Sequence, residues 1–114
     1  LPKDLNENGD VFGGWLVSQM DLAAAYYCKS IIQYKKVVTV SINNVTFIKP
    51  VPLGSVVSMY GELVKVGNTS ITVKMTVMIK SPVGEEIKAG CGEFVFVKID
   101  ENGIPISIGD INGK

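Results

Sequence analysis

The most constraining feature of this sequence is an apolar run at residues 15–28. Eleven of its fourteen residues are apolar, the exceptions being Ser18, Gln19 and Asp21. A run of this length, rich in Leu, Met and Ala, is typical of a helix rather than a strand. Because the apolar residues are spread nearly all the way round, the run predicts a buried helix that fades near residues 32–36.

Four runs rich in β-branched residues follow and predict strands at residues 37–49, 55–66, 69–80 and 87–99. Asn43 and Asn44 interrupt the first run and predict a bulge. Short turns join the later runs, so successive strands are expected to pair antiparallel. This order predicts an α+β fold in which an antiparallel sheet wraps a long central helix. A helix packed on one open face of a sheet is the alternative.

Size and charge narrow the class of protein. With 114 residues the chain is expected to form a single domain, residues 1–114, whose end from about residue 100 is rich in Gly, Asn and Asp and predicts a flexible tail. No apolar run reaches the ~18 residues of a membrane span, and no secretory signal is recognised, so a cytoplasmic protein without a membrane partner is expected. Eleven lysines balance eleven acidic residues, which argues against a nucleic-acid partner.

The sequence contains no histidine. This excludes Ser–His–Asp and Cys–His catalysis and histidine-ligated metals, so neither a metal nor a cofactor is expected. Cys28 and Cys91 lack the spacing of a metal or redox motif, and free buried thiols are favoured over a disulfide. Acid–base chemistry therefore falls to carboxylates, lysine or tyrosine.

Asp21 is the single acid of the predicted helix. On an apolar face a carboxylate costs several kcal/mol, roughly, unless it is paired, hydrogen-bonded or wetted by a cavity. No lysine lies within four residues of it, and helical spacing offers no charge partner. A bond to a neighbouring backbone amide is the structural alternative, but a functional cavity is favoured.

Two glycines, Gly13 and Gly14, open the helix. They are compatible with a simple entry turn. Amide N–H groups at a helix N-terminus are also suited to the oxygen of a carbonyl that gains negative charge. Upstream, Asn6 is either a turn residue or a side-chain amide that holds a water or a carbonyl.

The motif N-x-N-G-D-x-F-G-G-W-x-x-S-Q-M-D, from Asn6 to Asp21, and the later segment VVTVxxxxVTFIKPVPLGS resemble the hotdog-fold acyl-CoA thioesterases of the bacterial YciA-like type. The similarity covers about residues 5–98. It implies a hotdog fold, with the catalytic acid at Asp21, the helix-start glycine at Gly13 and the family's asparagine at Asn6. Hotdog dehydratases use a histidine, which this chain lacks.

The resemblance implies hydrolysis of an acyl-CoA thioester to CoA and a free acid. Gly13 N–H would polarise the carbonyl, and Asp21 would act either as general base or as nucleophile. Candidates for the CoA track are Lys49, with its neighbours Thr46 and Phe47, Gly14, and the turn Gly67, Asn68, Thr69 and Ser70. A solvated lysine and an ordinary hairpin turn explain these positions equally well. Tyr26 and Tyr27 are expected to be packing residues.

The spacing of Gly13 and Asp21 predicts a homodimer. Eight residues of helix separate them by about 12 Å, which exceeds the span of one thioester. Antiparallel helices of two chains would place Asn6 and Gly13 of one chain beside Asp21 of the other, giving shared active sites. The resemblance further implies hexamers built from three dimers. A non-catalytic acyl-CoA-binding module and a purely structural oligomer are the competing functions.

Overall fold

The apolar run forms one long helix in the computed structural model, which describes residues 13–109. The helix, α1, spans Gly13–Ile32. Its buried residues recur every fourth position, so they form one stripe along the helix: Leu16, Met20, Ala24 and Cys28. After Ile32, Gln33 has a positive φ of 53°, and the Tyr34 amide donates to the Lys29 carbonyl at 3.2 Å. This is a Schellman-type end, which stops the helix before the first strand.

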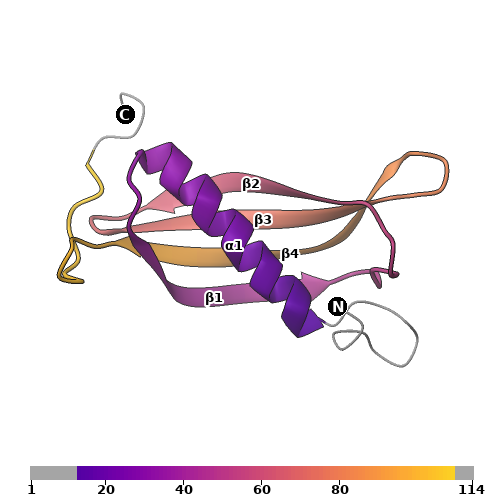
Figure 1. The fold of residues 1–114 in the computed structure, drawn as a ribbon, viewed down its shortest axis with the longest axis horizontal. Helices are drawn as coiled ribbons and strands as arrows, with labels where there is room; N and C mark the ends of the chain where they lie inside the picture. Colours follow the sequence, from indigo (N-terminus) through magenta and orange to yellow (C-terminus); the bar gives the residue numbers. More distant parts are fainter. Residues whose placement is uncertain (1–12, 110–114) are drawn as a thin grey trace.

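Four strands follow α1 and form one antiparallel sheet. They are β1 (Val37–Phe47), β2 (Val57–Val66), β3 (Ser70–Lys80) and β4 (Glu86–Lys98). Their order across the sheet is β1-β4-β3-β2, so β1 and β2 are its two edges. Figure 1 shows α1 lying diagonally across one face of this sheet. The predicted α+β hotdog fold is confirmed.

The sheet is apolar on the face that α1 covers. Alternate residues of the central strands are buried there, among them Val73 and Met75 of β3 and Phe94 and Phe96 of β4. The opposite face is polar, because Lys74 lies between Glu62 and Glu93 in the register of three neighbouring strands. This alternation is typical of an antiparallel sheet with one covered face.

The helix is less enclosed than its composition predicts. Leu22 and Tyr26 are 64% and 79% exposed on the side turned away from the sheet. One sheet covers one flank of a helix, and the remaining apolar side chains therefore stay open within a single chain. The expectation that Tyr26 packs is wrong. Tyr27 does pack, since its ring lies where a Cβ on Gly61 would fall, at 2.7 Å.

Two irregularities interrupt the edge strand β1. The register against β4 shifts between Thr39 and Ser41, and again between Asn43 and Thr46. Asn44 has a positive φ of 56° within the second shift. The bulge predicted at the asparagine pair is confirmed, and these shifts change which side chains of β1 point toward the helix.

Residues 100–109 do not form the flexible tail expected from their composition. The Asp100 carboxylate accepts hydrogen bonds from the amides of Asn102 and Ile104, which fixes a turn. Ile108 is only 4% exposed, and its amide donates to the Asn68 carbonyl at 2.8 Å. The Asp100 carboxylate and the buried Ile108 side chain thus order a segment whose composition predicts flexibility.

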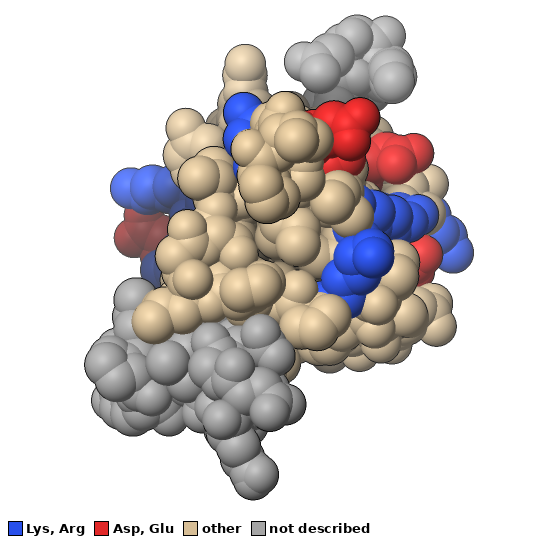
Figure 2. Space-filling model, turned by 90° about the vertical axis from the view of Figure 1, so that its right-hand side faces the viewer, with Lys and Arg blue, Asp and Glu red and all other residues tan. Residues whose placement is uncertain are grey.

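Side chains of both signs of charge lie at the end of the molecule near the start of α1. In Figure 2, lysine and acidic side chains lie mainly at the margins of this face, and its middle consists of other residues. No extended surface of one sign is visible on the face shown. That mixture agrees with the balance of eleven lysines and eleven acidic residues in the sequence.

Candidate active site

Asp21 lies in the middle of α1, on the flank that faces the edge strand β1. The Thr39 hydroxyl donates a hydrogen bond to Asp21 Oδ1 at 2.8 Å. In the register, Thr39 lies opposite Phe96, whose side chain is buried under the helix. The Thr39 side chain therefore points to the helix side of the sheet, immediately before the first register shift of β1. Asp21 and Thr39, eighteen residues apart in sequence, form the polar centre of this flank.

Asp21 has a hydrogen-bond partner on the neighbouring strand, although helical spacing offers it no charge partner. Its partner is the hydroxyl of Thr39, which the sequence analysis did not single out. The sequence does contain a threonine inside the otherwise apolar segment VVTV. Its distance from Asp21 along the chain gives no indication of contact, because only the packing of β1 beside α1 brings the two side chains together. Because the partner is uncharged, it orients the carboxylate without neutralising it.

The geometry leaves this carboxylate free for chemistry. The hydrogen bond occupies one oxygen, and among residues 13–109 no other hydrogen bond to Asp21 is formed. The side chain is half-buried, so it is accessible to a water or a substrate. An oriented, accessible carboxylate is able to act as a general base or as a nucleophile.

Gly13 is the first residue of α1, and its amide has no intrahelical acceptor at that position. The Phe47 ring, from the end of β1, lies close by: a Cβ on Gly13 would be 3.3 Å from Phe47 Cε2. The first turn contains no acidic residue that would compete for its amides. Glycine thus permits the close approach of Phe47 and places no side chain of its own beside the helix start.

Within one chain, Gly13 and Asp21 do not form a single site. Eight residues correspond to about 12 Å of axial rise and a turn of about 80° around the helix. Gly13 lies at the start of α1, whereas Asp21 lies mid-helix on the β1 flank. Asn6, the third predicted catalytic residue, lies outside the described residues.

The predicted CoA contacts fall into two groups. Four of them lie at the end of the fold where α1 begins and β1 ends: Gly14, Thr46, Phe47 and Lys49. All four are exposed, and Thr46 points to the sheet face away from the helix, opposite Cys91. The second group, residues 67–70, forms the β2–β3 turn at the other end of the sheet (Figure 1). A single chain does not bring the two groups together.

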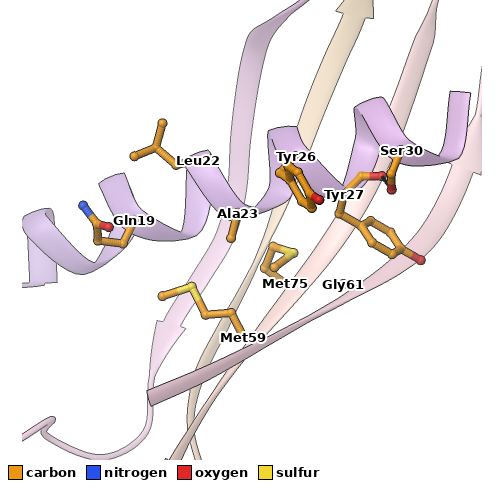
Figure 3. Close-up of a pocket in the computed structure, with 9 residues that line it drawn as sticks. All are labelled: Gln19, Leu22, Ala23, Tyr26, Tyr27, Ser30, Met59, Gly61 and Met75. Atoms are coloured by element: carbon orange, nitrogen blue, oxygen red, sulfur yellow. Dashed lines mark hydrogen bonds between the residues drawn. The ribbon is translucent and has the colours of Figure 1, made fainter. Parts of the chain in front are cut away.

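An apolar groove of about 540 Å³ lies on the opposite flank of α1 from Asp21, between the helix and β2. Figure 3 shows Met59 and Met75 rising from the strands toward Ala23, while Tyr27 extends over β2 at Gly61. The groove residues Ala23 and Tyr27 lie two and six positions after Asp21, which turns them to the far side of the helix. The groove is therefore separate from the Asp21–Thr39 pair of the same chain.

The comparison with known families decides the class of this fold. The sequence profile described as "Thioesterase superfamily" matches residues 8–85. The chain belongs to the thioesterase superfamily. That match includes Gly13, Asp21 and Thr39, so the residues that form the candidate site lie inside the family's own domain.

Three similar proteins support this assignment. An uncharacterized acyl-CoA thioester hydrolase of Buchnera aphidicola is 47% identical over 92% of this chain and 80% of its own length. The acyl-CoA thioester hydrolase YciA of Salmonella typhimurium is 43% identical over 92% of this chain and 81% of its own length. The crystal structure of HI0827, a hexameric broad specificity acyl-coenzyme A thioesterase in an aspartate-to-alanine form, has a TM-score of 0.90 and 41% identity, covering 100% of this chain and 84% of the other. The resemblance to YciA-like hotdog thioesterases is confirmed.

The remaining reactive groups of this thioesterase lie apart from the carboxylate. Cys28 and Cys91 are both free, and burial raises the pKa of the Cys28 thiol to about 11, an effect that the nearby charge of Lys29 partly offsets. Over residues 13–109, no three His, Cys, Asp or Glu side chains are grouped as a metal site requires. Within the same range, α1 is not both long and apolar enough to cross a membrane.

Proposed function

We propose that this chain hydrolyses acyl-CoA thioesters to CoA and a free carboxylic acid, with Asp21 as the reacting carboxylate. The family assignment and the names of the similar proteins support the reaction class. The observation that carries the role of Asp21 is the 2.8 Å hydrogen bond from Thr39, which aims a half-buried carboxylate out of the helix flank. A carboxylate with a purely structural role on an apolar surface is expected to have both oxygens bonded, whereas among residues 13–109 only Oδ1 of Asp21 is.

In this proposal the helix start supplies the electrophilic half of the site. The Gly13 amide, aided by the dipole of α1, donates to the thioester oxygen as it gains negative charge. Asp21 either removes a proton from the attacking water or attacks the carbonyl carbon itself to form a mixed anhydride, which water then hydrolyses. In both routes the C–S bond breaks and CoA leaves as its thiol. Asn6 would help to place the water or the carbonyl.

The exposed edge of the sheet supports a site shared between two chains. Val38, Val40 and Ile42 of β1 are all exposed, and a long apolar edge strand is a surface that proteins normally pair or cover. Pairing β1 with β1 of a second copy would bring that copy against the flank that carries Asp21 and Thr39. The start of the second helix would then supply the Gly13 amide that one chain holds about 12 Å away.

Three such dimers would make a hexamer, the assembly named for HI0827. A cytoplasmic location remains a prediction from the sequence. The competing function, an acyl-CoA-binding module without turnover, would retain the fold but would not need the Thr39–Asp21 geometry.

The discriminating experiment is thiol release from a panel of acyl-CoAs of different chain length, followed with a chromogenic thiol reagent. We expect turnover by the wild-type protein, undiminished in EDTA because the proposed mechanism uses no metal. A binding module would instead show saturable acyl-CoA binding by calorimetry with no thiol released. That outcome would overturn the proposed function.

A further inference from the structure

The turn between β3 and β4 presents an apolar side chain at its tip. Figure 1 shows this turn projecting beyond the end of the sheet. Val83 lies in the turn and is 81% exposed, more than any other large apolar side chain among residues 13–109. Turns usually carry Gly, Asn, Asp, Ser or Pro, because these residues suit the backbone of a turn. Turn chemistry therefore does not explain a valine at this position.

Hydrogen bonds hold the tip in a fixed position. The Gly84 amide donates to the Ser81 carbonyl at 2.9 Å, and the Ser81 amide donates to the Glu85 carbonyl at 2.7 Å. The Ser81 hydroxyl accepts from the Glu85 amide at 3.1 Å. Pro82 has a restricted φ, and Gly84 adopts a φ of 90° that returns the chain to the sheet. Val83 is therefore pre-organised, which lowers the entropy cost of docking it into a partner.

A hollow of about 440 Å³ lies beside this turn, between the turn and the loop at residues 52–56. Its apolar lining includes Pro52, Val56, Ile79 and Ile87. Two apolar side chains of the loop are open to solvent, since Leu53 is 61% exposed and Val56 is 60% exposed. The Lys80 amide donates to the Val56 carbonyl at 3.0 Å, which fixes the loop against the end of β3. We call Leu53, Val56 and Val83, together with this hollow, the strand-end patch.

The composition of the strand-end patch is typical of a protein–protein contact. Single exposed apolar side chains are common, but three of them beside one hollow form a surface that proteins usually cover. Charged groups of both signs border it, because Lys80 lines the hollow and Glu85 follows the tip of the turn. An apolar centre with a polar rim is the usual anatomy of such contacts.

We propose that the strand-end patch forms the three-fold contact between dimers, in which Val83 of one chain enters the hollow of the next copy. The inference rests on the hexamer of the proposed function. Pairing of β1 edges joins only two chains, so a hexamer needs a second contact on each chain. The occupant of the patch is therefore another copy of this chain.

The shape of the patch fits three-fold symmetry. A two-fold contact joins a surface to itself, whereas a three-fold contact joins two different surfaces of each chain. A projecting tip and a hollow are different surfaces with complementary shapes. Because they are neighbours, a three-fold axis close to this end of the sheet carries the tip of each copy to the hollow of the next. The ring then closes with every tip and every hollow occupied.

The patch remains free when the β1 edges pair. In the sheet order β1-β4-β3-β2, the projecting turn joins the two interior strands, whereas β1 is an edge. Edge pairing extends the sheet sideways, and the turn extends it along the strand direction (Figure 1). The two contacts therefore use different parts of the chain and are able to form together.

The test is the oligomeric state of charged variants. Wild type, Val83→Asp and Val56→Asp are compared by sedimentation velocity at one protein concentration. We expect a hexamer for the wild type and dimers for both variants, because each contact would bury a carboxylate without a partner. Aspartate suits a turn, so Val83→Asp should retain its fold, which circular dichroism checks. Thiol release per chain should stay within about twofold of the wild type, since each dimer contains complete sites.

The matched control is Ile104→Asp, which charges an exposed apolar side chain beside the turn at the other end of the sheet and should leave the hexamer intact. A hexameric Val83→Asp protein, or equal dissociation of Val83→Asp and Ile104→Asp, would overturn the contact and leave the patch to a different partner or to none. A hexameric Val56→Asp protein would overturn the insertion of the tip into the hollow. Val56→Asp also decides the outcome if the turn variant does not fold.

Sedimentation and turnover keep the two proposals distinguishable. A wild-type hexamer that releases no thiol counts against the proposed function and not against the contact. A wild type that hydrolyses acyl-CoA but remains a dimer at every concentration counts against the strand-end contact alone.

Discussion

Thr39 Oγ1 donates to Asp21 Oδ1 at 2.8 Å, and this hydrogen bond joins the middle of α1 to the edge strand β1. The hydroxyl belongs to the strand that a second copy is proposed to pair with. The carboxylate belongs to the helix flank that the same copy would face. Orientation of the proposed catalytic group and formation of the dimer edge are therefore linked through one side chain.

Asp21→Asn is expected to retain the fold and lose at least ~10²-fold in kcat, because an amide is nearly isosteric but is neither a base nor a nucleophile. The amide oxygen still accepts from Thr39, so the thermal unfolding temperature should change little. The measurement is steady-state thiol release beside a melting curve. Near-normal turnover by a folded Asp21→Asn protein would contradict the mechanism.

Thr39→Ala is expected to reduce kcat by about tenfold, with a smaller effect on KM, because Asp21 loses the donor that orients it. Thr39→Ser keeps the hydroxyl and should restore most of the rate. The serine variant is the matched control for any packing change at β1. If both variants are equally slow, packing of the threonine methyl rather than orientation of Asp21 explains the loss.

The helix and the strands were predictable because their signals are local. The apolar run predicted α1, and the alternation of apolar and polar residues over 71–79 predicted the buried face of β3. Asp21 was accessible from the sequence as a candidate, since an acid without a charge partner in an apolar run is unusual. The partner Thr39 was not, because its role depends on which way β1 faces, and that direction is set by register shifts that periodicity does not reveal.

Long-range contacts explain the other failures. Tyr26 and Tyr27 are adjacent and chemically identical, yet one is exposed and the other packs on Gly61, a residue of β2 that sequence proximity does not indicate. Residues 100–109 look loose by composition, but Ile108 is buried and bonded to Asn68. Both outcomes depend on contacts between segments that are distant in the sequence. Amino-acid composition contains no information about such contacts.

Cys28 should resist thiol reagents in the native protein. Burial raises the pKa of its thiol to about 11, so the reactive thiolate is scarce at pH 8. Because the folded-state pKa is raised, the associated stabilisation is complete below the unfolded value of about 9 and is lost as the pH rises toward 11. Titration with a chromogenic reagent should detect no more than one fast thiol per chain at pH 8, and two after unfolding. Two fast thiols in folded protein would contradict the burial of Cys28.

Gly90→Ala should destabilise the fold by about 1–3 kcal/mol, which corresponds to several degrees in melting temperature. A Cβ there would be 2.7 Å from the Thr46 carbonyl oxygen and 3.0 Å from Phe47 Cδ1, so β1 must move. Gly14→Ala is the control, because within residues 13–109 its added Cβ would meet no atom within 4 Å beyond its chain neighbours and its own helix, and alanine favours the helix. Both melting temperatures must be measured at one protein concentration, since oligomers unfold in a concentration-dependent way. Equal melting temperatures would contradict the tight β1–β4 approach.

The last prediction concerns the shared site, and it uses two inactive proteins. Gly13→Pro removes the amide N–H at a helix position where proline is tolerated, and Asp21→Asn removes the carboxylate. If each site takes Gly13 from one chain and Asp21 from the other, a mixed dimer contains one intact site of its two. Mixing the variants with subunit exchange should therefore restore thiol release from an inactive background, toward half the wild-type rate per mixed dimer.

Two controls decide how that experiment is interpreted. Gly13→Ala keeps the N–H but introduces the same crowding against Phe47, where the added Cβ would be 3.3 Å from Cε2, so it should remain largely active alone. Exchange is verified independently by mass spectrometry of differently tagged chains. Because a one-chain site would lack either the amide or the carboxylate in every subunit, such a site predicts no recovery at any mixing ratio. Demonstrated exchange without recovered activity therefore eliminates the shared site, whereas recovery in proportion to the mixed fraction requires that Gly13 and Asp21 act across the β1 edge.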